Sequence, residues 1–424
     1  MPKVANLWLQ EILRLLYKRR TATRNDIIQA TDLNPASVSH ALRLLLDRGT
    51  VLKIGERQSN GGRPSDVLSL NPEAGYFAAV DLEGRSIRFA LSNFVGDIRC
   101  RWEEDFEPGR PLQVNKLRTG VSRVLRDLDD EQRSRIIAVG VSYPGLLDQE
   151  GRLTAFNLGW QNFPFLTQLH EELHLPIFAE HDKHSCVLAE RWLGCAQECT
   201  DGLFVIVERG IGVGVFLDGK PVDGWRGMVG ELGHCIIEPD ADDLCGCGRR
   251  GCLESIASSV NIVRQYRERT RTADNKQLRV TDVFERARRG DIVAKAVLER
   301  AGKALGRALS YAIQFLNPEI IIFGGDIIAG EDVLLPIVKE EIVRCTLPEV
   351  LSGVKITLSS LGLDIRLRGA VSMAFRTSLQ DADLLEKMCA PVLNGKQASA
   401  PRSLDRGTGA RPAVFLAAPH TDRS

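Results

Sequence analysis

The sequence has no uninterrupted apolar run that approaches the ~18 residues of a membrane-spanning helix. Its apolar N-terminal stretch is interrupted by the charged residues Glu11 and Arg14, which argues against a secretory signal. The chain also lacks an excess of charge of one sign, because 55 Lys and Arg balance 55 Asp and Glu. These absences predict a cytoplasmic protein that has no membrane partner.

Positive charge is nevertheless concentrated near the N-terminus. Residues 1–70 hold 11 Lys and Arg against 6 Asp and Glu, a net charge of +5, so the remaining residues carry a net charge of −5. A basic segment joined to an acidic body suggests a small polyanion-binding module attached to a second domain. The length of 424 residues is compatible with two or three domains.

Residues 1–72 have the pattern of a winged helix-turn-helix. Apolar residues at helical spacing predict three successive helices, and two short strands after them predict a hairpin, or wing. The three helices begin near residues 6, 24 and 36, and the two strands cover 50–56 and 66–70. In this order of elements the third helix is placed to enter the major groove of DNA.

Double-stranded DNA is the partner that this segment predicts. The residues expected to face it are Ser37, Ser39, His40 and Arg43 on the third helix and Arg63 at the tip of the wing. Arginine reads guanine edges or the width of the minor groove, whereas the serines and the histidine can equally contact phosphate. The alternative is a three-helix dimerisation module with an incidental hairpin, but the net charge of +5 and the Gly-Gly-Arg-Pro tip favour DNA.

Residues 75–380 have a mixed α/β pattern. Strand-rich runs over 76–105 and 202–220 are each followed by helices, and a last buried strand over 319–326 ends in Gly-Gly. Two consecutive halves of this kind suggest a duplicated α/β architecture with a ligand cleft between two lobes.

A histidine and three cysteines gather in one Gly-rich loop. His234 is followed after ten residues by Cys245, Cys247 and Cys252. One imidazole and three thiolates suit a closed, tetrahedral, structural zinc site. The alternative is a set of unligated thiols, which a polar loop rarely collects at this density. We therefore predict structural Zn²⁺ in the loop 234–252 rather than disulfides, which a chain of this length does not need.

The string GMVGELGHCIIEPDADDLCGCGRRGCLE, which contains this loop, resembles the signature of the ROK family (repressors, open reading frames and kinases). The resemblance covers nearly the whole chain. It implies a two-lobed, actin-like ATPase fold of the ribonuclease-H type, a homodimer or homotetramer, and a pocket for a sugar or sugar phosphate. It further implies that the sugar hydroxyls are bound by Asn157, Asp182, Glu231, His234 and Glu254.

The phosphate-binding loops of the family's kinases are altered in this chain. Glu83 replaces a glycine of the first loop, and Glu208 stands where the second loop begins with glycine. An acidic side chain beside a polyanion opposes nucleotide binding. The resemblance and these replacements together predict that kinase chemistry is lost and that no residue is catalytic. Asp182, the general base of the family's kinases, is then an acceptor for a sugar hydroxyl.

The sequence thus predicts a sugar-responsive transcriptional regulator of carbohydrate genes, with repression as the expected direction. Two rivals stay open: an active ATP-dependent sugar kinase that carries a DNA-binding head, and an interaction protein whose body docks another protein. Residues 390–424 lack periodicity and apolar content, so we expect a disordered tail.

Overall fold

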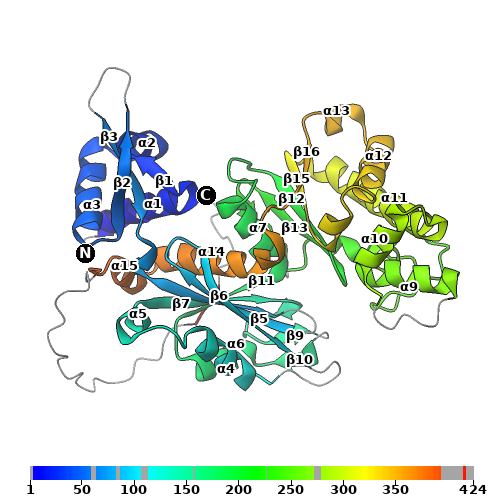
Figure 1. Ribbon diagram of the computed structural model, residues 1–424, viewed down its shortest axis with the longest axis horizontal. Helices are drawn as coiled ribbons and strands as arrows, with labels where there is room; N and C mark the ends of the chain where they lie inside the picture. Colours follow the sequence, from blue (N-terminus) through cyan, green and yellow to red (C-terminus); the bar gives the residue numbers. More distant parts are fainter. Residues whose placement is uncertain are drawn as a thin grey trace. The chain divides into compact units, whose positions relative to one another are not determined.

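The structure is a computed structural model, and the chain divides into two compact units (Figure 1). Unit 1 comprises residues 1–185 and 366–424, and unit 2 comprises residues 186–365. The residues that the structure describes are 3–58, 64–82, 86–106, 113–155, 158–225, 227–271, 278–392 and 414–416.

The first seventy residues of unit 1, here called the head, contain three helices and a three-stranded sheet. Thr23 caps the second helix in a capping box with Asp26, and Asn34 caps the third helix ahead of Pro35. The third helix is followed by Gly49 at a φ of 71°, which glycine adopts without strain. The elements are α1 (Lys3–Arg19), β1 (Thr21–Thr23), α2 (Arg24–Ala30), α3 (Pro35–Asp47), β2 (Val51–Arg57) and β3 (Ser65–Leu70).

The predicted helices and hairpin of the head are therefore present. Strand β1 was not predicted, and it pairs antiparallel with β3. Three residues are too few to show the alternation of apolar and polar residues by which a strand is recognised.

The body of unit 1 is a sheet between helices. Its strands lie in the order β17-β11-β7-β4-β5-β6, in which β5 is antiparallel to both β4 and β6, whereas β7 is parallel to both β4 and β11. Side chains alternate along β4, so that Tyr76 and Val80 join the core beneath α4 and α6 whereas Phe77 contacts Phe375 of α14 on the other face. The elements are β4 (Tyr76–Leu82), β5 (Ser86–Asn93), β6 (Ile98–Asp105), α4 (Asn115–Val124), α5 (Asp130–Ser134), β7 (Ile136–Tyr143), β8 (Leu146–Leu147), β9 (Leu153–Ala155), β10 (Trp160–Phe163), α6 (Phe165–Leu173), β11 (Ile177–His181), α14 (Ile365–Gln380), α15 (Ala382–Met388) and β17 (Val414–Leu416).

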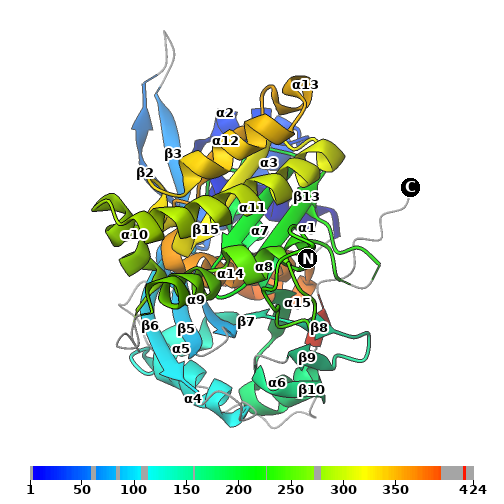
Figure 2. The same cartoon turned by 90° about the vertical axis from the view of Figure 1, so that its right-hand side faces the viewer.

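Unit 2 is built on a five-stranded sheet in the order β14-β13-β12-β15-β16. Along β12, Val205 packs into the core formed with α11, and Phe204 packs toward α7 on the opposite face. Figure 2 shows α11 and α12 side by side across this sheet. The elements are α7 (Asp182–Leu193, which begins in unit 1), β12 (Gly202–Val207), β13 (Ile211–Leu217), β14 (Lys220–Pro221), η3 (Leu232–His234), α8 (Leu253–Ala257), α9 (Ser259–Thr270), α10 (Val280–Arg288), α11 (Ile292–Leu316), β15 (Ile320–Gly325), α12 (Leu335–Cys345), α13 (Pro348–Leu351) and β16 (Lys355–Leu358).

The two sheets share one topology, as the mixed α/β pattern predicts. Five strands of unit 1 lie in the order β6-β5-β4-β7-β11, and those of unit 2 lie in the order β14-β13-β12-β15-β16, which is third, second, first, fourth and fifth in each case. The helices expected after the first strand-rich run are α4 and the short α5. Among the described residues, no helix combines the length and apolar character needed to cross a membrane.

The disorder predicted for residues 390–424 falls outside the described residues, apart from 390–392 and 414–416. The last three of these form β17, which pairs parallel with β11.

Candidate functional site

Asp182 is one of the two predicted sugar-binding residues of unit 1, and it begins α7 directly after β11. His181 Nδ1 lies 2.9 Å from Asp182 Oδ1, and the backbone N–H of Lys183 donates to the same oxygen at 2.7 Å. Burial alone raises the pKa of Asp182, but the His181 contact and the charges of Arg366 and Lys183 outweigh it and hold the pKa well below its ordinary value. The carboxylate is thus a fixed, ionised hydrogen-bond acceptor at neutral pH.

A second carboxylate, Asp81, lies on the strand that precedes the first phosphate-loop segment. It is 1% exposed, and Arg88 on the adjacent strand donates to it at 2.6 Å. Burial raises the pKa of Asp81 against the opposing charges of Arg366 and Arg88. Asp81 and Arg88 are direct partners across the β4–β5 hairpin. The guanidinium of Arg88 therefore lies beside the Asp81 carboxylate, at the end of β4 that precedes the first phosphate-loop segment.

Neither arginine of this cluster, Arg88 or Arg366, was predicted from the sequence. Arg88 could have been predicted, because it is a charged residue within the apolar run of β5. The turn between β4 and β5 places it directly opposite Asp81. Arg366 comes from the start of α14, far along the chain, and no local pattern marks it.

The predicted sugar-binding residues of unit 2 gather around one end of β13. His234 closes the short helix η3, and its Nε2 lies 3.8 Å from Oε2 of Glu231, which is too long for a direct hydrogen bond. Glu254 is the second residue of α8, and its Oε2 accepts the N–H of Ile211 at 3.0 Å. The structure therefore brings Glu231 beside His234 and fixes Glu254 against the second phosphate-loop segment.

The predicted metal ligands also come together. The Nδ1 of His234 lies 3.5 Å from the Sγ of Cys245, and the Sγ of Cys247 lies 3.7 Å from the Sγ of Cys252. A tetrahedral ion with Zn–S bonds of about 2.3 Å and a Zn–N bond of about 2.0 Å needs ligand separations of roughly 3.5–3.8 Å. His234, Cys245 and Cys247 form a group that could hold a metal ion. These three residues fit such an ion, to which His234 would offer its Nδ1, and Cys252 lies beside Cys247 but outside this group of three.

The thiols differ in how readily they ionise without a cation. Burial raises the pKa of Cys245 to about 12, and burial also raises the pKa of Cys252. Hydrogen bonds from the backbone and side chain of Arg249 instead lower the pKa of Cys247 to about 6. Cys247 is therefore the thiol that ionises most readily, and a bound cation would favour the thiolate form of the other two.

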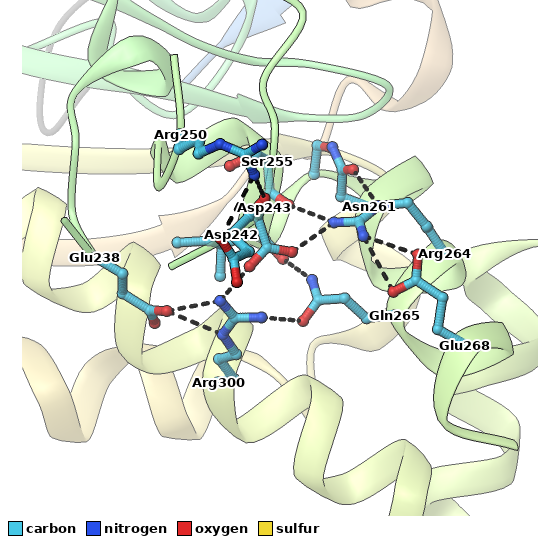
Figure 3. A network of polar contacts seen from close by, with 12 residues as sticks. Glu238, Asp242, Asp243, Arg250, Ser255, Asn261, Arg264, Gln265, Glu268 and Arg300 are labelled. Carbon is cyan, nitrogen blue, oxygen red and sulfur yellow. Dashed lines mark hydrogen bonds and ion pairs between the residues drawn. The ribbon is translucent and has the colours of Figure 1, made fainter. Parts of the chain in front are cut away.

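A polar network fixes the segment that leads into these cysteines (Figure 3). Asp243 accepts hydrogen bonds from Arg264 of α9, at 2.6 Å, and from Arg300 of α11. Arg300 also donates to Glu238 at 2.7 Å and to Gln265 at 2.9 Å. Two helices thus hold the loop two residues before Cys245, and no motif in the sequence revealed this.

The second phosphate-loop segment places an acid against the Gly-Gly turn at the end of β15. A Cβ atom added to Gly325 would lie 2.6 Å from the Cγ of Glu208, and the φ of Gly325 is 83°. The Glu208 side chain therefore occupies the space beside this turn.

Several predicted residues lie elsewhere. Asn157, Arg63 and Glu83 are outside the described residues. The expectation that Ser37 lies on the exposed face of α3 is wrong, because its side chain is buried with that of Ala41 on the inner face of the helix.

The other predicted DNA contacts are accessible. His40 and Arg43 are exposed, and Ser39 is partly exposed and donates to the Pro35 carbonyl at 2.5 Å. The imidazole of His40 packs edge-on against Trp8 of α1 with ring centroids 6.3 Å apart.

Comparisons with known proteins identify relatives of both kinds that the sequence suggested. Residues 77–377 match the ROK family. The chain is 29% identical to a glucokinase from Halalkalibacterium halodurans over 308 residues, or 69% of this chain and 93% of the glucokinase. It is 26% identical to a xylose repressor from Caldicellulosiruptor bescii over 386 residues, or 87% of this chain and 95% of the repressor. The crystal structure of a ROK family transcriptional regulator, a homologue of the E. coli MLC protein, covers 90% of this chain and 99% of its own, with a TM-score of 0.73 and 25% identity.

Proposed function

The chain belongs to the ROK family, and from this premise we propose that it is a transcriptional repressor of carbohydrate genes that responds to a sugar or a sugar phosphate. The observation that carries the proposal is the head of three helices and a hairpin that precedes the ROK body. The repressor alignment extends over 386 residues and the glucokinase alignment over 308, which favours a regulator.

In this proposal the head is a winged helix-turn-helix that binds double-stranded operator DNA. Helix α3 offers Arg43 and His40 to the major groove, and the β2–β3 hairpin carries Arg63 toward the minor groove. Arg57 on β2 contacts Asp26 on α2 at 3.0 Å, which braces the wing against the helices. As a dimer or tetramer, the protein would read half-sites separated by about one helical turn of DNA or a multiple of it.

The effector is a sugar bound by Asn157, Asp182, Glu231, His234 and Glu254. Carboxylates accept pairs of hydroxyl hydrogen bonds, and a sugar offers several such donors. His234, Cys245, Cys247 and Cys252 would hold Zn²⁺ as a structural ion, which supplies a rigid anchor and no reaction chemistry. Anchored in this way, the loop keeps Glu231 and Glu254 in place for the sugar.

The alternative function is an ATP-dependent sugar kinase with a DNA-binding head, and the glucokinase relative is the observation that favours it. Against it, Glu208 adds negative charge beside the Gly324–Gly325 turn, and Arg88 already neutralises Asp81. Phosphoryl transfer depends on positioning and on neutralising the phosphate charge, so both features oppose it.

A thermal-shift panel on the purified full chain tests the proposal. The ligands are D-xylose, D-glucose, N-acetyl-D-glucosamine, the 6-phosphates of the last two, and ATP with Mg²⁺, each alone. A ligand at 100 times its dissociation constant stabilises the folded state by roughly 2.7 kcal/mol. We expect one sugar to raise the unfolding temperature, ATP to leave it unchanged, and Glu231→Gln to abolish the sugar effect.

The same sugar should then release the protein from genomic DNA fragments selected for binding to it. A shift with ATP, together with sugar-dependent ADP release that Asp182→Asn removes, would establish the kinase instead. A sugar that leaves DNA binding unchanged would contradict the repressor proposal.

A further inference from the structure

The chain passes between the two units at two places, and both lie in helices. The first is between residues 185 and 186 in α7, the helix that Asp182 begins. The second is between residues 365 and 366, at the start of α14. Any change in how the units are arranged must therefore act on these two helices.

Within unit 1, the start of α14 touches α7 and the sheet with no side chains between them. A Cβ atom on Gly369 would lie 1.9 Å from the carbonyl oxygen of Ser185, in the first turn of α7. A Cβ atom on Gly140 of β7 would lie 2.1 Å from the carbonyl oxygen of Ala370. Because backbone meets backbone at both points, α14 cannot stay in place if α7 is displaced.

Arg366, in the first turn of α14, is 7% exposed and acts electrostatically on both Asp81 and Asp182. Gly369 places the same part of α14 against the first turn of α7, which Asp182 begins, so packing and charge together join the candidate sugar-binding carboxylate to α14. Arg366 acts through Asp182 and is therefore a positioning residue.

The other end of α14 carries the head, as Figure 1 shows for unit 1. The rings of Phe375 and Tyr17 of α1 stack with centroids 4.1 Å apart, and the Tyr17 hydroxyl lies 3.5 Å from the Ser372 hydroxyl. Tyr17 is fully buried, and a Cβ atom on Gly96 would lie 2.4 Å from its hydroxyl. We call Tyr17, Gly96, Ser372 and Phe375 the head seat.

The segment after α14 holds the second end of the head. The Arg48 side chain, at the end of α3, donates to the Cys389 carbonyl at 3.0 Å, and the Val392 N–H donates to the Arg48 carbonyl at 2.8 Å. The proposed DNA-reading helix is thus tied to the same C-terminal segment as α1.

The spacing along α14 agrees with a rigid link. Phe375 and Arg366 are nine residues apart, about 13 Å in a helix, and their neighbours Phe77 and Asp81 are four residues apart, about 13 Å in a strand. The helix therefore runs along β4 from the Asp81–Asp182 cluster to the head seat.

We infer that α14 transmits occupation of the sugar site to the DNA-binding head, with Arg366 as the positioning residue at one end and the head seat at the other. This inference rests on the proposed repressor function. Coupling between two sites is reciprocal, so sugar must weaken DNA binding by the same factor as DNA weakens sugar binding.

The test uses the full chain, the DNA fragment recovered by selection, and the sugar that raises the unfolding temperature. The coupling factor is the ratio of DNA dissociation constants with and without sugar. We expect Phe375→Leu to move this factor at least threefold toward one while sugar binding to the DNA-free protein changes less than twofold. Tyr17→Phe, which removes only a hydroxyl, should move the factor in the same direction, and it keeps the test available if Phe375→Leu does not fold.

Phe89→Leu is the matched control, because Phe89 of β5 is as buried as Phe375 but packs against Gly120 of α4, on the face of the sheet opposite to α14. It should leave the coupling factor unchanged. Arg366→Met should weaken sugar binding and leave the affinity for DNA without sugar intact. An unchanged coupling factor in Phe375→Leu or Tyr17→Phe, or an equal loss in Phe89→Leu, would overturn the inference alone. A wild-type coupling factor of one would remove the proposed function and the inference together.

Discussion

Asp182 in unit 1 and the carboxylates of Glu231 and Glu254 in unit 2 differ in what fixes them. Asp182 is held by contacts with His181 and Lys183 and by nearby buried charge. Glu231 and Glu254 instead flank the loop that brings the histidine and cysteines together. The comparison predicts that loss of a metal ion would leave the surroundings of Asp182 in unit 1 unchanged and would disturb the segments that carry Glu231 and Glu254 in unit 2.

Removing one predicted metal ligand is the most direct test of this comparison, and it has the largest expected effect. Cys252 is fully buried, and Cys252→Ser should lower the metal content from about one ion per chain to near zero, since a structural site needs its four ligands. The sugar-induced thermal shift should disappear, and DNA binding without sugar should change less than threefold. Mass spectrometry for metal, thermal shift and gel shift measure the three quantities.

Cys186→Ser is the control, because Cys186 is a buried cysteine of unit 2 outside the loop. It should retain the metal and the sugar response. Full metal content in Cys252→Ser would show that the fourth ligand is another group.

Breaking the buried Asp81–Arg88 ion pair tests how charge stabilises unit 1. In Arg88→Met the carboxylate of Asp81 loses the guanidinium that now lies 2.6 Å away. Removing one partner of a buried pair costs about 3–5 kcal/mol, and Arg366 nearby keeps the expected value near 3 kcal/mol. Urea denaturation should show this loss with the metal content unchanged.

The double variant Asp81→Leu with Arg88→Met is the control for the ion pair. It removes both charges together and should recover most of the stability. If the double variant is as unstable as Arg88→Met, packing rather than the unpaired charge is responsible.

How far the sequence predicts this site depends on where each residue lies. The metal ligands and the glutamates beside them belong to one contiguous motif, so their proximity could be predicted. Arg300 and Arg264 reach the same loop from helices farther along the chain, and only the packing of α9 and α11 shows this. The fold class was predictable for a similar reason, because strands and helices alternate locally, whereas the contact of α14 with the head is not local.

The error at Ser37 has a simple helical cause. Ser37, Ala41 and Leu45 are each four residues apart and share the buried face of α3. The phase of the apolar residues therefore already placed Ser37 inside, and its polarity concealed this.

An acid titration tests a carboxylate of unit 2 that lies outside the loop, and its expected effect on stability is smaller. Hydrogen bonding to Arg344, working against burial, and the charges of Arg344 and Arg307 lower the pKa of Glu341 on α12 from 4.5 to about 2. A lowered pKa stabilises the fold fully above the unfolded value, so this contribution should be lost as the pH falls from about 4.5 through 2. Because Arg344 is largely exposed, we expect about 1–2 kcal/mol from this residue.

Glu341→Gln should reduce the loss of stability between pH 5 and pH 2, as measured by urea denaturation at several pH values. Glu340→Gln, an exposed neighbour on the same helix, is the matched control and should behave as the wild type. An unchanged acid response in Glu341→Gln would mean that other groups dominate the acid unfolding of unit 2.

The prediction with the smallest effect tests whether the head can be destabilised without changing the metal content or the affinity for sugar. The Thr23 hydroxyl accepts the Asp26 N–H at 3.1 Å, and Thr23→Ala removes this cap of α2 at a cost of about 1 kcal/mol. DNA affinity should fall a few-fold, because α2 positions α3, while metal content and sugar affinity stay unchanged. Thr21→Ala, at an exposed position of β1, should leave DNA affinity unaltered. A sugar affinity that falls in Thr23→Ala would mean that the head influences sugar binding even without DNA, and Asp182, Glu231 and Glu254 could then no longer be treated as independent of the head.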